Sequence, residues 1–233
     1  MLVSLDHSPE ALCRSMLERN SDTISIRKPE VAIKKLVVII ETALAISNRK
    51  GFHAMSLREL SKEAGISMGG LYAYFDSKTT LLNMILSQVA TSVEDVLQHP
   101  PEEATKDPIS HLRWLIAAHI HLTEEMLSWF AFCFMEAKSF PEKERQMAIE
   151  SSMFTEQVFA DVIKRAVAQN MLREDVSPFL PSLIKPLLQD WYVKRAKYRK
   201  RNISVETYVQ TIQDFVLAAV LPVSESSNSP KPN

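Results

Sequence analysis

Apolar residues recur every three or four positions along most of this chain, which is the spacing of one face of an α-helix. The first sustained run begins at Pro29, a residue suited to the first turn of a helix. It ends near "NRKG", where basic residues and Gly51 form a typical C-terminal helix signal. The pattern predicts one long helix whose apolar face consists of Ile33, Leu36, Val37, Ile40 and Leu44.

The segment that follows predicts two short helices joined by a tight turn. Ser56 is suited to cap the first, with Glu59 three residues later as in a capping box. Gly65 permits the left-handed backbone of a turn, and Ser67 is suited to cap the second helix. This arrangement matches the helix-turn-helix pattern. We expect its internal core to consist of Leu60, Ala64, Ile66, Leu71 and Tyr74.

A further helix, capped by Asp76 or Ser77, presents its apolar side at Leu82, Ile85, Val89, Val93 and Val96. It ends at "QHPPEEATKDP", a connection rich in proline and charge. The rest of the chain again has helical periodicity, and we expect no β-sheet. The predicted helices lie near residues 108–121, 123–138, 141–170, 177–200 and 204–221.

Two of these later helices carry further signals. Pro181 and Pro186 predict a bend or break near the start of the helix at 177–200. The last helix has one apolar stripe with two flanking valines, Val209 and Val216. The stripe consists of Tyr208, Ile212, Phe215 and Ala219.

Charge is divided unevenly along the 233 residues. The net charge is −1, yet residues 25–80 contain nine Lys and Arg against five Asp and Glu, so this segment carries +4 and the remainder −5. This asymmetry indicates a basic module joined to an acidic body. The two cysteines, Cys13 and Cys133, are far apart in sequence, which argues against a disulfide framework or a structural zinc site. No signal peptide or membrane-spanning run is visible, so we expect a cytoplasmic protein.

The stretch "GFHAMSLRELSKEAGISMGGLYAYFDSKTTLL" resembles the signature of the tetracycline-repressor (TetR) family of transcriptional regulators, and the resemblance covers roughly residues 33–82. It implies an all-α fold with an N-terminal three-helix helix-turn-helix DNA-binding domain and a C-terminal helical ligand-binding and dimerisation domain. It also implies a homodimer formed by the last two helices, which binds operator DNA and is released by a small effector.

The resemblance assigns DNA contacts to individual positions. Phosphate contacts are expected from Ser56, Tyr72, Tyr74 and Lys78, and base contacts from Ser67, Met68, Gly69 and Gly70. Members of the family often have lysine where this chain has Met68 and Asp76, and histidine where it has Ala73. These departures remove polar groups from the DNA side. Met68 and Ala73 could instead contact thymine methyl groups, with Arg27, Lys28, Lys34 and Lys35 contributing phosphate contacts.

The domains expected are a flexible N-terminal arm at 1–29, the helix-turn-helix domain at 30–80, the effector and dimerisation domain at 81–222 and a disordered tail at 223–233. Within the arm, one short helix is expected around "PEALCRSMLER". Large apolar residues around 114–140 suggest an apolar effector pocket with a few polar groups, although any single aromatic residue could equally be core. The candidate ligand residues are Trp114, His121, Phe130, Phe134, Met135 and Trp191.

Other classes of site have weaker support in the sequence. His119 and His121 point to different sides of a helix and lack the i, i+4 spacing of a zinc site, so we expect no metal or other cofactor. The basic run at 194–201 fits a solvated helix end, and the alternative is a site for an anionic effector or a second DNA contact. An enzyme is the main competing class, but no phosphate loop, nucleophile elbow or "HExxH" motif is present and no catalytic residue is expected. Composition leaves open a helical adaptor for partner peptides.

Overall fold

The computed structural model describes residues 6–20 and 29–222, and this part of the chain is helical without any strand. The predicted all-α class is therefore confirmed. The predicted tail at 223–233 and the arm cations Arg27 and Lys28 lie outside the described residues. No described helix is both long enough and apolar enough to cross a bilayer.

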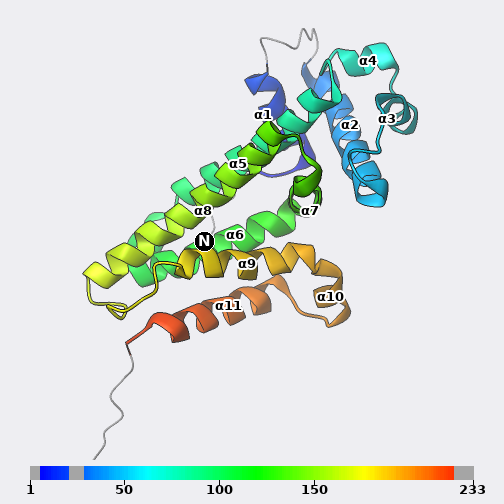
Figure 1. The fold of residues 1–233 in the computed structure, drawn as a ribbon. Coiled ribbons are helices and arrows are strands. Elements are labelled where there is room, and N and C mark those ends of the chain that lie inside the picture. The colour runs from blue at the N-terminus through cyan, green and yellow to red at the C-terminus, as the bar shows by residue number, and fades with distance from the viewer. Residues whose placement is uncertain (1–5, 21–28, 223–233) are drawn as a thin grey trace, which may run out of the picture.

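The N-terminal helices α2 (Pro29–Lys50), α3 (Leu57–Ala64) and α4 (Met68–Tyr72) form one end of the molecule (Figure 1). α5 (Lys78–Gln98) leaves this end and runs along the body, where it packs against α6, α7 and α8. The boundary expected at residue 80 thus falls within a continuous helix. A single rigid element therefore joins the two parts of the fold.

Part of the predicted arm belongs to the core. Residues of α1 (Pro9–Arg19) form the expected short helix, which packs on α2 and α5. Leu12, Cys13 and Met16 lie on one face of this helix and are almost fully buried. That apolar face is the reason that residues 9–19 are packed and not mobile as predicted.

The body contains the later helices in the predicted order. They are α6 (Pro108–Glu125), α7 (Leu127–Glu136), α8 (Glu142–Ala168), α9 (Leu180–Val193), α10 (Arg195–Lys200) and α11 (Val205–Val220). Short 3₁₀ turns, η1 (Glu102–Thr105) and η2 (Ala137–Ser139), precede α6 and follow α7. The core of the body lies between α5, α6, α8 and α9, which pack on one another.

The break predicted near Pro181 and Pro186 lies elsewhere. Pro181 occupies the first turn of α9, where a missing N–H is tolerated, and Pro186 lies inside the helix without ending it. The helix divides at Lys194. Here Asp190 accepts hydrogen bonds from Lys197 and Tyr198 and pairs with Lys194. Burial alone would raise the pKa of Asp190, but these hydrogen bonds lower it to about 2.

The last helix only partly follows its predicted stripe. Tyr208 and Ile212 are buried, whereas Phe215 is 62% exposed and Ala219 is also exposed. α11 packs on α6 and α9, and these contacts bury Val209 and Val216 instead. The outer part of the predicted stripe therefore has no partner within the described part of the chain.

Candidate functional site

The helix-turn-helix unit is built as its local signals predict. Ser56 caps α3 by accepting a hydrogen bond from the Glu59 N–H at 3.1 Å. Gly65 ends α3 in the left-handed region with φ of 65°. Ser61 Oγ donates to the Ile66 carbonyl at 2.6 Å, so the small side chain that faces the turn also holds it.

The second helix, α4, has an exposed side and a packed side. Its cap Ser67 accepts a hydrogen bond from the Gly70 N–H at 3.1 Å. Ser67, Gly69, Tyr72 and Ala73 are exposed, with Tyr72 at 53%. Met68 is half-buried and packs partly against the core. We call the exposed set, Ser67, Gly69, Tyr72 and Ala73, the α4 face.

The two adjacent glycines, Gly69 and Gly70, differ in the space around them. A Cβ added to Gly69 would meet no atom within 4 Å, so this position is open to an approaching molecule. A Cβ on Gly70 would lie 2.9 Å from Ile66 Cγ2 and 3.2 Å from Ser67 Oγ. Gly70 is therefore required by packing within the turn and does not belong to the open surface as predicted.

Tyr74 lies in the core. Its ring is only 7% exposed, and its hydroxyl donates to the Ala32 carbonyl of α2 at 3.2 Å. Burial raises the pKa of this hydroxyl. In this structure the hydroxyl of Tyr74 is thus committed to α2, contrary to the predicted phosphate contact. Tyr74 joins α2 to the end of α4.

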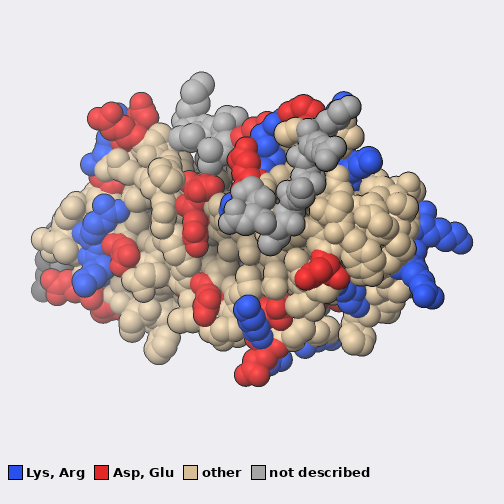
Figure 2. All heavy atoms as spheres, turned by 90° about the horizontal axis from the view of Figure 1, so that it is seen from above, with Lys and Arg blue, Asp and Glu red and all other residues tan. Residues whose placement is uncertain are grey.

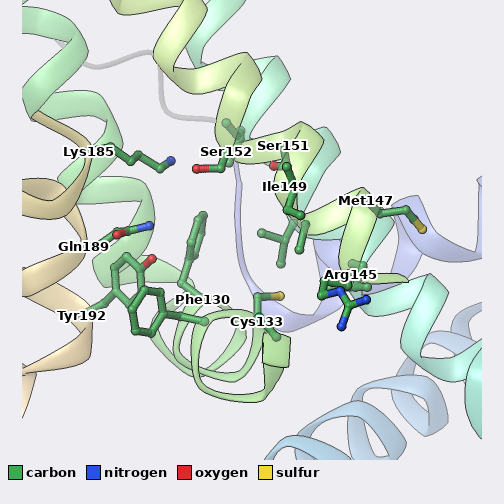
Figure 3. A pocket seen from close by; sticks show the side chains of 16 residues that line it. Phe130, Cys133, Arg145, Met147, Ile149, Ser151, Ser152, Lys185, Gln189 and Tyr192 are labelled. Atoms are coloured by element: carbon green, nitrogen blue, oxygen red, sulfur yellow. The ribbon is translucent and has the colours of Figure 1, made fainter. Parts of the chain in front are cut away.

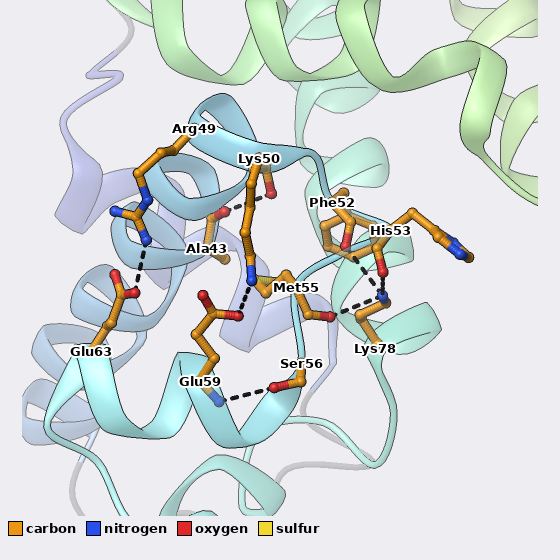
Figure 4. Close-up of polar contacts among 11 residues, drawn as sticks. Ala43, Arg49, Lys50, Phe52, His53, Met55, Ser56, Glu59, Glu63 and Lys78 are labelled. Atoms are coloured by element: carbon orange, nitrogen blue, oxygen red, sulfur yellow. Dashed lines mark hydrogen bonds and ion pairs between the residues drawn. The ribbon is translucent and has the colours of Figure 1, made fainter.

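Lys78 is also committed within the chain (Figure 4). Its Nζ donates to the carbonyl oxygens of Phe52, His53 and Met55 at 3.1, 2.8 and 3.0 Å. The ammonium lies 5.1 Å from the centroid of the Phe52 ring, and burial lowers its pKa. The sequence suggested a phosphate contact for this lysine. The structure shows that it holds the loop between α2 and α3 to the start of α5.

The remaining cations of this end differ in their availability. Arg49 pairs with Glu63 at 2.7 Å and Lys50 with Glu59 at 2.5 Å, which neutralises one side of α3 (Figure 4). Arg58 and Lys62 of α3 are exposed and form no ion pair with any described residue. Basic side chains project at the end of the molecule that carries α3, and basic and acidic side chains are mixed over the rest of the same view (Figure 2).

Arg58 and Lys62 were not identified as site residues from the sequence. The available signal was their position on α3 opposite the apolar side at Leu57 and Leu60. Lys34 and Lys35 of α2 are likewise exposed. These four cations provide positive charge at the same end of the fold as the α4 face.

The body contains a mostly apolar cavity of about 210 Å³ between α5, α7, α8 and α9 (Figure 3). Of the predicted ligand residues, Phe130 and Phe134 line it. The sequence does not indicate the other walls of the cavity, because they come from four helices whose pairing no local pattern reveals. Those walls include Val89 and Val93 of α5, Cys133 of α7, Ser151 and Ser152 of α8, and Lys185, Gln189 and Tyr192 of α9.

The other predicted ligand residues lie apart from this cavity. Met135 lines a second, more polar cavity of about 630 Å³ between α2, α7 and α10. Trp191 is fully buried, and its Nε1 donates to Glu124 at 3.0 Å. Trp114 and His121 line neither cavity, and Trp114 packs against the core.

Half of the basic run at 194–201 has partners inside the protein. Arg195 forms two hydrogen bonds with Glu124, each of 2.8 Å, while Lys194 and Lys197 pair with Asp190. These contacts hold α10 to α6 and α9. They give the run a structural role at these three positions.

No group of three or more His, Cys, Asp or Glu within residues 6–20 and 29–222 is arranged to hold a metal ion. His119 is 1% exposed, and its Nε2 lies 3.3 Å from Lys185 Nζ. Burial, and then the charge of Lys185, lower the pKa of His119 well below its ordinary value. This histidine is therefore neutral.

One contact joins the cavity wall to the helix-turn-helix unit. Glu136, the last residue of α7, accepts a hydrogen bond from the Phe52 backbone N–H at 2.9 Å. Phe52 belongs to the loop that Lys78 holds, and its ring packs edge-on against Phe132 of α7 at 5.5 Å. α7 thus lines the 210 Å³ cavity on one side and contacts the loop before α3 on another.

A helix-turn-helix head with an exposed second helix, attached to a helical body with an apolar cavity, defines a class of DNA-binding regulator. Residues 39–85 match the family model described as bacterial regulatory proteins, tetR family. The uncharacterized HTH-type transcriptional regulator YerO of Bacillus subtilis is 34% identical over 79 residues, covering 30% of this chain and 27% of that protein. The chain thus spans well under two thirds of the length of this curated relative.

Solved structures share the fold over most of this chain. The TetR family regulator PfmR of Thermus thermophilus has a TM-score of 0.64 at 23% identity, covering 78% of this chain and 97% of that one. FadR of Bacillus subtilis, solved in complex with stearoyl-CoA, has a TM-score of 0.60 at 14% identity, with 79% and 98% covered. The comparisons support a TetR family transcriptional regulator: the family model matches the helix-turn-helix unit, and the solved structures share the fold.

Proposed function

We propose that this protein binds a palindromic operator as a homodimer, represses transcription in the cytoplasm, and is released from DNA by a small, mostly apolar effector. The observation that carries the proposal is the α4 face, Ser67, Gly69, Tyr72 and Ala73, exposed beside the cations Arg58 and Lys62, which pair with no described residue. In a helix-turn-helix unit the second helix enters the major groove while the first lies across the phosphate backbone. The exposed α4 face offers a small polar surface to the bases, and the cations of α3 offer positive charge to the phosphates.

Within this proposal, α4 approaches the bases through Ser67, Gly69 and Ala73, and Met68 contributes its exposed edge. The hydroxyls of Ser56 and Tyr72, and the side chains of Arg58 and Lys62, contact phosphates. Phosphate contacts give affinity without sequence preference and make it depend on salt. A gel-shift assay with genomic fragments at low salt tests DNA binding directly. Absence of any shifted fragment would contradict the proposal.

The glycine pair offers a sharper test of the α4 face. Gly69→Ala is expected to raise the free energy of unfolding by up to about 1 kcal/mol, because alanine favours helix and the site is open. The same substitution is expected to weaken operator binding roughly tenfold, since the added methyl separates α4 from the groove. Urea denaturation and gel-shift titration measure the two effects.

Gly70→Ala is the matched control. Its methyl meets Ile66 at 2.9 Å, so the variant is expected to lose about 1–3 kcal/mol of stability through overpacking. An unchanged operator affinity in Gly69→Ala would contradict the proposal that α4 approaches DNA closely at Gly69. Equal stability of the two variants would contradict the packing role assigned to Gly70.

The proposed dimer uses α9 and α11, which pack side by side at one edge of the body (Figure 1). Their outer surface carries apolar residues that nothing in the described part of the chain covers: Phe179, Leu183, Phe215 and Leu221, each at least 40% exposed. Apolar patches of this kind mark association sites. A second copy using the same surface gives a two-fold dimer that matches a palindromic operator.

An effector site in the body is supported by the cavity and by FadR, which shares this fold and was solved with stearoyl-CoA. We infer that the contact from Glu136 to the Phe52 N–H transmits effector binding to the heads. A ligand that packs against Phe130 and Phe134 changes the position of α7, and with it the loop that precedes α3. The ligand must favour a head spacing that mismatches adjacent major grooves, which shifts the population away from the DNA-bound form.

The substitution Glu136→Ala tests this link without any ligand. It leaves the buried Phe52 N–H without its acceptor, which costs about 1–3 kcal/mol locally. We expect amide exchange in residues 51–56 to accelerate roughly tenfold or more while α8 stays protected. Hydrogen-exchange mass spectrometry provides the measurement, and Lys138→Ala, an exposed neighbour, is the control. Unchanged exchange at Phe52 would show that the loop is held without Glu136.

A further inference from the structure

We propose that the 210 Å³ cavity binds a small monocarboxylate with an aromatic or medium-length aliphatic tail, and that Lys185 pairs with its carboxylate. This inference rests on the proposed function, since it names the chemical class of the effector. It depends on three observations: the charge of the lining, the surroundings of Lys185, and the size of the apolar part.

The lining carries positive charge and no negative charge. Among the described residues that form it, the charged side chains are Lys185 of α9 and Arg145 of α8, without any Asp or Glu. In Figure 3, Lys185 points toward Ser152 on the facing helix, while Arg145 lies near Met147, away from it. Such a lining attracts an anion, whereas a cation would be repelled by the two positive charges.

Lys185 has no carboxylate partner among the described residues. Its Nζ lies 3.3 Å from His119 Nε2, the one hydrogen-bond contact that the ammonium makes with them. The charge of Glu156 of α8 acts on Lys185 without a direct contact, and its carboxylate accepts a hydrogen bond from Ser182 at 2.5 Å. Burial lowers the pKa of Lys185 to about 8, so the amine still carries a proton at neutral pH. A partly buried ammonium without a counter-charge is costly, and a ligand carboxylate supplies that counter-charge.

His119 helps to orient the amine. An ammonium can only donate hydrogen bonds, so the neutral imidazole must accept through Nε2 and carry its proton on Nδ1. That Nδ1 is buried without a hydrogen-bond partner among residues 6–20 and 29–222. His119 therefore fixes Lys185 from behind without neutralising it. The hydroxyl groups of Ser151 and Ser152 and the amide of Gln189 add polar groups to the lining, and Ser152 lies nearer to the amine than Ser151 does (Figure 3).

The apolar part sets the size of the tail. Its walls are Leu86, Val89, Val93, Phe130, Phe134 and Ile149. An apolar cavity of about 150 Å³ holds a benzene molecule, so 210 Å³ leaves room for one ring with a short acid side chain. A long acyl chain with a nucleotide, such as the stearoyl-CoA bound by FadR, exceeds this volume.

Calorimetric titration of the full chain with two acid and alcohol pairs tests the proposal. The pairs are 3-phenylpropanoate with 3-phenylpropan-1-ol, and octanoate with octan-1-ol, which differ in charge while keeping the tail. At least one acid is expected to bind roughly tenfold or more tightly than its alcohol, the gain of a charge-assisted hydrogen bond. The variant Lys185→Met keeps side-chain length, and it is expected to abolish this preference. Lys164→Met, an exposed lysine on α8, is the matched control and is expected to keep the preference.

Circular dichroism and thermal melting establish that Lys185→Met folds, and its Tm is expected to equal or exceed that of the wild type. Equal binding of acid and alcohol, an acid preference that survives in Lys185→Met, or no acid binding at millimolar concentration would each overturn the assignment. A gel-shift assay on the same samples distinguishes the two proposals. If the protein binds DNA but no acid, only the proposed effector class is refuted. If it binds an acid but shifts no DNA, the proposed regulatory function is refuted and the carboxylate site stands.

Discussion

Phe215→Asp is expected to separate the proposed dimer into monomers and to weaken operator binding by roughly 100-fold or more. Phe215 is 62% exposed on α11, and Leu183 of α9, the helix against which α11 packs, is also 62% exposed. In a two-fold interface each substitution appears twice. Two carboxylates would then be buried in an apolar contact without partners, at a cost of several kcal/mol each. Light scattering after size exclusion measures the mass, and gel-shift titration measures the affinity.

Met153→Asp is the matched control for this result. Met153 is also 62% exposed and apolar, but it lies on α8. Its substitution is expected to leave both mass and operator affinity unchanged. A wild-type protein that is monomeric at micromolar concentration, or a Phe215→Asp variant that remains dimeric, would show that α9 and α11 do not form the interface.

Trp191→Ala is expected to lower the free energy of unfolding by about 3–5 kcal/mol, the range for removing a fully buried aromatic side chain. The Trp191 ring stacks on Tyr198 at 5.4 Å and packs against Tyr208 at 4.9 Å. The guanidinium of Arg195, the first residue of α10, lies 4.4 Å from the centroid of the Trp191 ring. The residue therefore joins α9, α10 and α11. Urea denaturation at fixed protein concentration provides the measurement.

Phe134→Ala is the contrasting variant. Phe134 lines the cavity and is 44% exposed, so its loss is expected to cost about 1 kcal/mol or less. The same variant should change ligand binding, which Trp191→Ala affects only through folding. If Trp191→Ala were as stable as Phe134→Ala, the ring would not be the anchor that its contacts indicate.

The sequence was most informative where a signal is local. The caps at Ser56 and Ser67 and the turn at Gly65 each depend on neighbours within a few residues, and each is present in the structure. The helix periodicity likewise indicates which side of a segment is buried, although in α11 the predicted stripe is only partly buried. The fold class and the helix-turn-helix unit were therefore predictable from one chain.

Tertiary contacts changed the role of several residues in the same stretch. Tyr74 donates to Ala32 of α2, and Lys78 donates to carbonyl groups around Phe52. Each partner lies more than 20 residues away in sequence. No motif specifies those partners, because the family signature gives residue types and not their hydrogen bonds. For the same reason, the sequence alone did not separate the open Gly69 from the packed Gly70.

By itself, the sequence determined that this protein is all-helical, with a helix-turn-helix unit near its N-terminus, since caps, turns and apolar spacing act over short distances. The tertiary structure alone decided which side chains share the cavity. Its lining comes from α5, α7, α8 and α9, and the pairing of those helices places Lys185 of α9 opposite Ser152 of α8. The physical reason is that a cavity is the space left between packed helices, and its chemistry depends on contacts between residues far apart in the chain.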